Sequence, residues 1–64
     1  MDDYIKDKLK RIISEELTRQ EKLILILYYY EEMTMKEIGA VLNMPDSVVT
    51  QEHSSLIQRI KYSL

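Results

Sequence analysis

Residues 34–57, TMKEIGAVLNMPDSVVTQEHSSLI, contain two short helical patterns separated by a break that is too tight for ordinary helix packing. The first pattern opens on a capping box, because Thr34 stands three residues before Glu37 and each side chain can satisfy a backbone N–H group of the other residue. Gly39 lies in the middle of this pattern, where glycine costs about 1 kcal/mol relative to alanine. We therefore expect a helix over residues 35–42 that another helix crosses very closely at Gly39.

The break itself consists of residues that end one helix and begin the next. Asn43 suits the left-handed conformation that closes a helix, and Pro45 prevents the helix from continuing. Asp46 or Ser47 is expected to cap a second helix over residues 47–62. A helix, a turn of three or four residues and a second helix make up a helix-turn-helix.

The last helix has two different faces at about 100° per residue. The apolar face consists of Val49, His53, Leu56, Ile57 and Ile60. The opposite face is polar and uncharged, and consists of Ser47, Gln51, Ser54 and Gln58, with Thr50 and Ser55 beside them. Short polar side chains can approach base edges, and glutamine pairs with adenine in the major groove. An ordinary solvated face is the alternative interpretation. His53 is expected to be half-buried at a helix crossing, and a phosphate contact is its alternative role.

Two further helices are expected upstream, over residues 2–14 and 19–30. The second has its own capping box, because Glu21 follows Thr18 by three residues. It also carries the apolar run LILILYYY at residues 23–30. A helix that is apolar all round should be buried all round, and a chain of 64 residues can hardly surround one completely. One interpretation is a partner surface made by Leu23, Ile26, Leu27 and Tyr30. The other is a well-wrapped central helix whose tyrosine hydroxyls reach water.

Length and composition limit the class of protein. With 64 residues the chain makes one small all-α domain of four helices, either by itself or as part of a longer protein. Cysteine is absent and His53 is the single histidine, so no metal site and no cofactor are expected. No apolar run approaches the ~20 residues that span a bilayer, and we expect a cytoplasmic protein without a membrane partner.

Catalysis has no support in the sequence. There is no cysteine nucleophile, no Ser–His–Asp set and no glycine-rich phosphate loop. The paired acids Glu15-Glu16 and Glu31-Glu32 are adjacent in sequence, and adjacent helical side chains point about 100° apart. Neither pair makes two converging carboxylates, so we expect a protein that is not an enzyme.

The run LYYYEEMTMKEIGAVLN, followed by S-x-V-x-Q-x-H-S and a terminal Arg-Ile-Lys, resembles region 4 of bacterial sigma factors, most closely the flagellar type. The resemblance covers residues 17–61. It implies a four-helix unit that binds the −35 promoter element with its last helix. It also implies docking on the flap of the RNA polymerase β subunit and binding by an anti-sigma factor. Response regulators share this topology, but residues 28–43 fit the sigma factors better.

The resemblance assigns two groups of residues to DNA. Gln51 would read bases with support from Ser47, Thr50, Ser54 and Ser55. Phosphates would be held by Lys36, Arg59 and Lys61.

A second hypothesis keeps the sigma fold without useful DNA affinity. Residues 44–58 contain no Lys or Arg, although the family's reading helix usually begins with arginine, and they include Asp46 and Glu52. The formal charge of the chain is −2, whereas a DNA-binding protein that acts alone usually presents a basic patch. The chain would then be a protein-interaction module that binds the polymerase flap, an anti-sigma factor or a second copy of itself.

Overall fold

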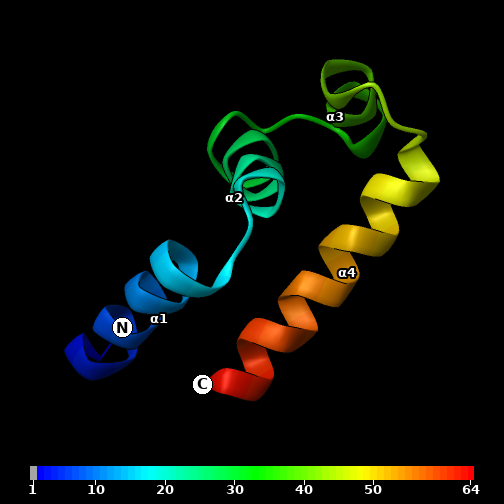
Figure 1. Cartoon of the computed structure of the whole chain (residues 1–64). Coiled ribbons are helices and arrows are strands. Elements are labelled where there is room, and N and C mark those ends of the chain that lie inside the picture. The colour runs from blue at the N-terminus through cyan, green and yellow to red at the C-terminus, as the bar shows by residue number, and fades with distance from the viewer. Residues whose placement is uncertain (1) are drawn as a thin grey trace.

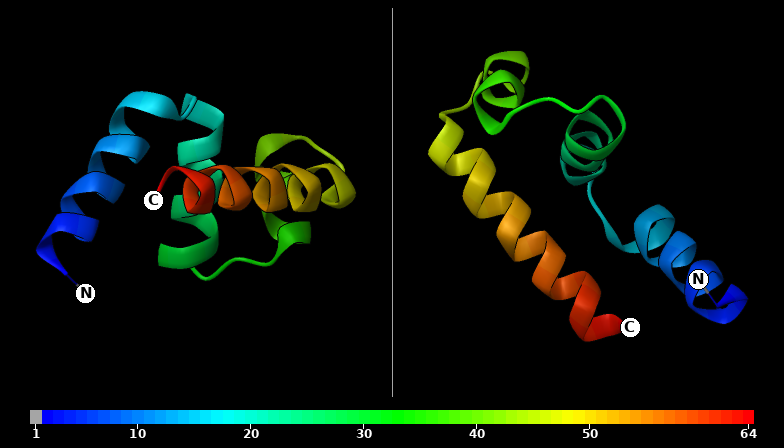
Figure 2. Two further views of the ribbon diagram at one scale, coloured as in Figure 1. Left: turned by 90° about the horizontal axis from the view of Figure 1, so that it is seen from below. Right: turned by 180° about the vertical axis from the view of Figure 1, so that it is seen from behind.

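The computed structural model describes residues 2–64, and these residues form four helices and no strand. The helices are α1 (Asp3–Glu16), α2 (Arg19–Leu25) with its continuation η1 (Ile26–Tyr30), α3 (Met35–Leu42) and α4 (Asp46–Ser63). The longest of them, α4, runs along one side of the molecule, with α3 at its N-terminal end and α2 beside it, seen nearly end-on (Figure 1). Further views show α1 beside the C-terminal end of α4, away from α3 (Figure 2). The all-α fold that ends in a helix-turn-helix, here α3 and α4, is as predicted.

The first helix is longer than the sequence pattern indicated. Asp2 does not belong to it but caps it, because its side chain accepts a hydrogen bond of 2.8 Å from the backbone N–H of Tyr4. The helix ends at Glu16 instead of at residue 14. Leu17 then turns to an extended conformation and is buried in the core, which fixes the point at which the chain must leave the helix.

The second helix covers the predicted residues, but its two halves differ in type. Thr18 and Glu21 form both hydrogen bonds of the capping box. The helical segment covers residues 19–30 as predicted, but residues 26–30 form a π-helix instead of a continuation of the α-helix. The N–H of Glu31 donates to the carbonyl of Ile26 over 3.0 Å, a bond between residues five apart. Such wide turns are rare, and many occur at functional sites.

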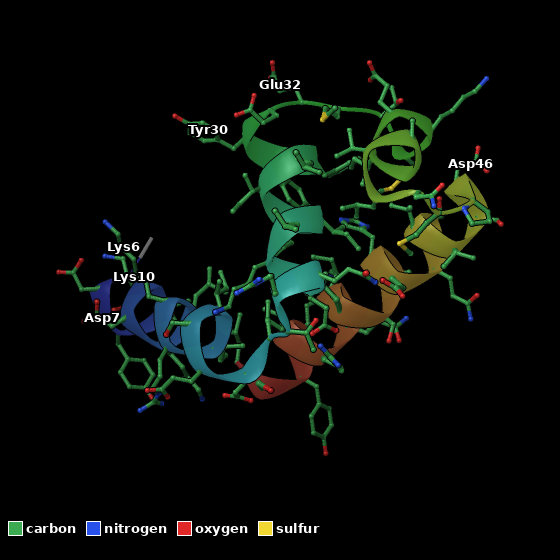
Figure 3. The ribbon with its side chains drawn as sticks, turned by 45° about the horizontal axis from the view of Figure 1, so that its top comes forward. Lys6, Asp7, Lys10, Tyr30, Glu32 and Asp46 are labelled. Carbon is green, nitrogen blue, oxygen red and sulfur yellow. The ribbon has the colours of Figure 1, made fainter. Side chains whose placement is uncertain are left out.

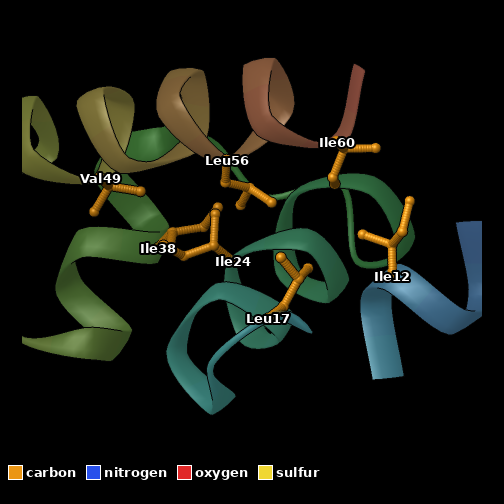
Figure 4. Packing of buried hydrophobic residues seen from close by; sticks show 7 residues of the cluster. All are labelled: Ile12, Leu17, Ile24, Ile38, Val49, Leu56 and Ile60. Carbon is orange, nitrogen blue, oxygen red and sulfur yellow. The ribbon is translucent and has the colours of Figure 1, made fainter. Parts of the chain in front are cut away.

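The core lies along the inner side of α4 and draws on all four α-helices (Figure 4). It consists of Ile12, Leu17, Ile24, Ile38, Val49, Leu56 and Ile60. Burying one such side chain fully contributes about 1.5–3 kcal/mol, so these few contacts hold α4 in its position. No helix within residues 2–64 combines the length and the apolar character that a membrane span requires.

The tight turn confirms the expected close approach at Gly39. A Cβ atom added to Gly39 would lie 2.5 Å from the backbone oxygen of Met44 and 3.4 Å from the backbone nitrogen of Asp46. The close neighbour is thus the turn and the first residue of α4. Asn43 closes α3 in the left-handed conformation, with φ 57°, as predicted. The N–H groups of Asn43 and Met44 both donate to the carbonyl of Gly39.

The start of α4 differs from the prediction. Neither Asp46 nor Ser47 caps the helix, because Pro45 occupies the cap position and no side chain bonds to the free N–H groups. The φ of −58° and ψ of 143° at Pro45 are extended, so the helix begins one residue earlier than expected, at Asp46. The carboxylate of Asp46 lies in the first turn, where it interacts favourably with the positive end of the helix dipole.

Candidate nucleic-acid interface

The outer face of α4 is the candidate interface, and the core determines its direction. Val49, Leu56 and Ile60 are buried against the other helices. Because these three residues fix the rotation of α4 about its own axis, the side chains on the opposite face must point to solvent. The sequence predicted both faces, and the structure confirms them.

All members of the predicted polar face are exposed. They are Ser47, Thr50, Gln51, Ser54, Ser55 and Gln58. Ser47 and Gln51, four residues apart, lie on the same face of the first two turns of α4. The hydroxyl of Thr50 donates to the carbonyl of Asp46 over 2.9 Å, so it can only accept a further hydrogen bond. The amides of Gln51 and Gln58 are the largest groups on this face that can both donate and accept, and Gln51 is the one nearer the start of α4.

One of the two acids in the first part of α4 is turned away from this face. Glu52 is half-buried, and it accepts a hydrogen bond of 2.9 Å from the amide of Gln20 at the start of α2. Asp46 is exposed in the first turn (Figure 3). A phosphate at the N-terminus of α4 would therefore meet the carboxylate of Asp46 but not that of Glu52.

The three predicted phosphate-binding cations have different surroundings. Lys36 lies exposed in the first turn of α3, and Lys61 lies exposed in the last turn of α4. Arg59 donates from Nη2 to Oε2 of Glu21 over 2.5 Å, so its charge is already paired with a carboxylate of the same chain. The sequence did not indicate this ion pair, because the two residues are 38 positions apart.

His53 lies half-buried where α4 crosses η1, as predicted. Its Nε2 atom is 2.8 Å from the hydroxyl of Tyr29, and its ring packs on Tyr28 with 4.8 Å between the ring centroids. Burial lowers the pKa of His53 below its ordinary value, so the ring is neutral at pH 7. A neutral ring engaged with Tyr29 is poorly suited to bind a phosphate.

A second candidate surface is an apolar groove of about 570 Å³ between α1, the end of α2 with η1, and the C-terminal part of α4. Its apolar lining includes Leu9, Ile13, Leu25, Ile26, Tyr30 and Ile57. Tyr30 is 82% exposed and points away from the body of the molecule beyond the end of α2 (Figure 3). Lys22 and Lys61 also line the groove.

The predicted partner surface only partly coincides with this groove. Ile26 and Tyr30 line it. Leu23 is exposed but lies outside the groove, and Leu27 is partly buried against the core. The sequence did not predict that Leu9 and residues of other helices line the groove. Periodicity shows that each helix has an apolar face, but it does not show that these faces stay apart and form a groove. The interpretation that the second helix is fully wrapped is excluded by its exposed side chains.

Residues 2–64 hold no group of histidine and carboxylate side chains that could bind a metal ion. The polar face of α4 offers hydrogen bonding, and the groove offers apolar contact.

The chain is similar to known proteins along its whole length. A family model described as sigma-70, region 4 matches residues 15–61. The RNA polymerase sigma factor FliA of Escherichia coli (strain K12) is 44% identical over 64 residues, which are 100% of this chain and 26% of that protein. FliA of Yersinia enterocolitica is 50% identical over 50 residues, 78% of this chain and 22% of that protein. The RNA polymerase sigma-D factor of Bacillus subtilis (strain 168) is 40% identical over 60 residues, 89% of this chain and 24% of that protein.

The chain thus spans about a quarter of the length of these curated relatives. No solved structure matches it significantly.

Proposed function

The chain belongs to the sigma-70 region 4 family, and from this we propose that it reads the −35 element of bacterial promoters as part of a flagellar-type RNA polymerase sigma factor. This is a DNA-binding family and not a family of enzymes. The proposed reader acts in the bacterial cytoplasm together with RNA polymerase.

The observation that carries the proposal is the exposed polar face of α4, with Gln51 at its centre. Val49 and Leu56 hold the opposite face of the helix in the core, so the polar face is presented by a rigid element. An α-helix fits the major groove of B-DNA, where a glutamine amide can bond to N6 and N7 of adenine. Ser47, Thr50, Ser54 and Ser55 would support this reading. Phosphates would be contacted by Lys36, Arg59 and Lys61.

The weak basic character of the molecule fits a reader that is held in place by a partner. Phosphate neutralisation supplies most non-specific affinity for DNA, and residues 44–58 offer no cation for it. A tethered domain needs less affinity of its own, because the partner raises its effective concentration at the promoter. Glu52 points toward Gln20, so its carboxylate does not lie on the face that would contact DNA. Of the two acids at residues 44–58, only Asp46 then opposes DNA binding.

Binding of the 64-residue chain to a duplex with a −35 element and to a scrambled duplex tests the proposal. The measurement is made at about 50 and 200 mM salt, since phosphate contacts weaken with salt. Tighter binding to the −35 duplex that weakens with salt supports a reader. Absence of binding at the lower salt concentration contradicts the proposal and favours the second candidate, a protein-interaction module.

The apolar groove is the proposed docking surface for the polymerase β flap, and it is the feature that favours the second candidate. Ile26 and Tyr30 would contact the flap, with Leu23 and Leu27 as neighbouring parts of the predicted surface. Ile26 is 50% exposed and Val41 on α3 is 58% exposed, so both tolerate replacement. We expect Ile26→Asp to weaken binding of an isolated flap segment and Val41→Asp, away from the groove, to leave it unchanged. Equal effects of the two variants would contradict this location.

An anti-sigma factor is a further proposed partner of the same groove. Apolar contact area is limited in so small a domain, and two partners that need it would exclude each other. We therefore expect a flap segment to displace a bound anti-sigma factor, and simultaneous binding of both would place the anti-sigma factor elsewhere.

A further inference from the structure

Glu21 serves two partners with its two carboxylate oxygens. Oε1 accepts a hydrogen bond of 2.9 Å from the N–H of Thr18 and so closes the capping box of α2. Oε2 accepts from Nη2 of Arg59 on α4 over 2.5 Å. The side chain of Glu21 is only 16% exposed, while that of Arg59 is 54% exposed. Glu21 is thus fixed at the start of α2, and Arg59 is the partner that is free to move.

Arg59 is placed where a DNA backbone contact is expected. It follows Gln51 by eight residues, which is about 12 Å along the helix and about 80° around it. The guanidinium has five donors, and a phosphate can accept two of them side by side. Arg59 and Lys61 are the only basic residues of α4, so the state of Arg59 affects half of the positive charge on the reading helix.

The surroundings of this ion pair make an exchange of partners feasible. Arg59 is half-exposed, and water and salt weaken an ion pair whose cation reaches solvent. A phosphate brings a charge that can draw the arginine away, and departure of Arg59 leaves the capping bond between Glu21 and Thr18 intact. The fold therefore does not have to change for Arg59 to move to DNA.

We propose that Glu21 competes with a DNA phosphate for Arg59 and thereby lowers the affinity of the domain for DNA. This inference rests on the proposed DNA-reading function. Free of DNA, Arg59 is held by Glu21. On DNA, Arg59 moves to the DNA backbone. The loss of the internal ion pair then offsets part of the binding free energy gained from the phosphate contact. Glu21 acts as a positioning residue in this device and does not itself touch DNA.

Glu21→Gln tests the competition, because glutamine keeps an oxygen that accepts from Thr18 but loses the charge that holds Arg59. We expect binding of the −35 duplex to become tighter by up to about fivefold, because the variant has no internal ion pair to break. The slope of log K against log salt should stay close to that of the original chain, because Arg59 contacts a phosphate in both complexes. In a chain that already carries Arg59→Gln, the further change Glu21→Gln should no longer alter DNA binding.

Glu52→Gln is the matched control. It removes one carboxylate from the same region, but Glu52 bonds to Gln20 and not to Arg59. The inference is supported if Glu21→Gln raises the affinity for DNA more than Glu52→Gln does, and if this increase is lost in the chain that carries Arg59→Gln. Equal behaviour of the two variants, with the original chain still binding DNA, overturns the inference and leaves the proposed function standing. Failure of all these chains to bind at low salt overturns both.

A measurement on the unaltered chain keeps the test independent of variant folding. The side-chain N–H resonances of Arg59 should shift when the −35 duplex is added, because the guanidinium changes partner. The amide resonance of Thr18 should remain nearly in place, because its bond to Oε1 of Glu21 persists. Unshifted Arg59 resonances in the saturated complex would show that the internal ion pair survives, and the inference would then be wrong.

Discussion

The hydroxyl of Tyr29 lies 2.8 Å from Nε2 of His53 and joins η1 to the middle of α4. Tyr28, the preceding residue, also packs on the imidazole ring, and the two tyrosine rings meet edge to face at 4.8 Å. A π turn holds more residues than an α turn, so neighbouring side chains diverge by a smaller angle. In η1 both of these consecutive tyrosines contact the same histidine.

The free energy of unfolding should depend on pH through His53. Burial lowers its pKa in the folded state, and in the unfolded state it titrates near its ordinary value of about 6.5. The unfolded chain therefore binds the proton more readily than the folded chain does. Stability should be level above about pH 6.5 and should fall as the pH drops toward the lower, folded-state pKa. Urea unfolding at several pH values between about 5.5 and 7.5 measures this dependence.

His53→Gln is the control for that experiment, because glutamine can bond to Tyr29 but does not titrate. His53 is the single histidine, and unperturbed carboxylates titrate below about pH 5. The fall in stability between about pH 6.5 and 5.5 should disappear in the variant. A variant that retained the same fall would assign the effect to other groups.

Gly39→Ala should destabilise the domain, although alanine is the better helix former. The added Cβ would lie 2.5 Å from the backbone oxygen of Met44, which cannot move without disturbing the turn. We expect the steric cost to exceed the propensity gain and to give a net loss of about 1–3 kcal/mol. The neighbouring exposed residue gives the comparison, since Ala40→Gly should cost about 0.5–1 kcal/mol through propensity alone. Stabilisation by Gly39→Ala in urea unfolding would contradict the close approach.

Glu32→Gly should stabilise the domain. Glu32 is exposed and has a φ of 57°, a left-handed conformation that is unfavourable for a residue with a Cβ atom (Figure 3). Relief of this cost, less the extra backbone entropy of glycine, should add about 0.5–1 kcal/mol to the free energy of unfolding. Glu31 has a φ of −87°, so Glu31→Gly should lower stability slightly. A loss of stability in Glu32→Gly would show that its side chain makes a stabilising contact.

The predictions that succeeded rest on residues close together in the sequence. Thr18 with Glu21 and Thr34 with Glu37 are capping boxes whose two members belong to the same helical turn, and both form as expected. The left-handed Asn43 follows from the same kind of local preference. The exposed face around Gln51 is also predictable, because periodicity shows which side of a helix the core must take.

The features that were not predicted depend on residues far apart. The π turn after Leu25 places Tyr29 against His53, 24 positions later, and the pattern LILILYYY contains no sign of it. The pairing of Arg59 with Glu21 likewise arises only when α2 lies across α4. Sequence alone therefore identified Arg59 as a basic residue near the end of the reading helix but not that its charge is already engaged.

Gln51→Ala should weaken binding of the −35 duplex by about 1–3 kcal/mol and reduce the preference over a scrambled duplex. The amide is expected to make a bidentate contact with one base, and alanine can make neither bond. Gln58 lies on the same exposed face about two turns further along α4, beyond the helix start that enters the groove in a helix-turn-helix. Gln58→Ala should therefore change binding to both duplexes by the same small factor. An unchanged sequence preference in Gln51→Ala would exclude Gln51 as the base-reading residue, and uniform weakening on both duplexes would instead place it at the backbone.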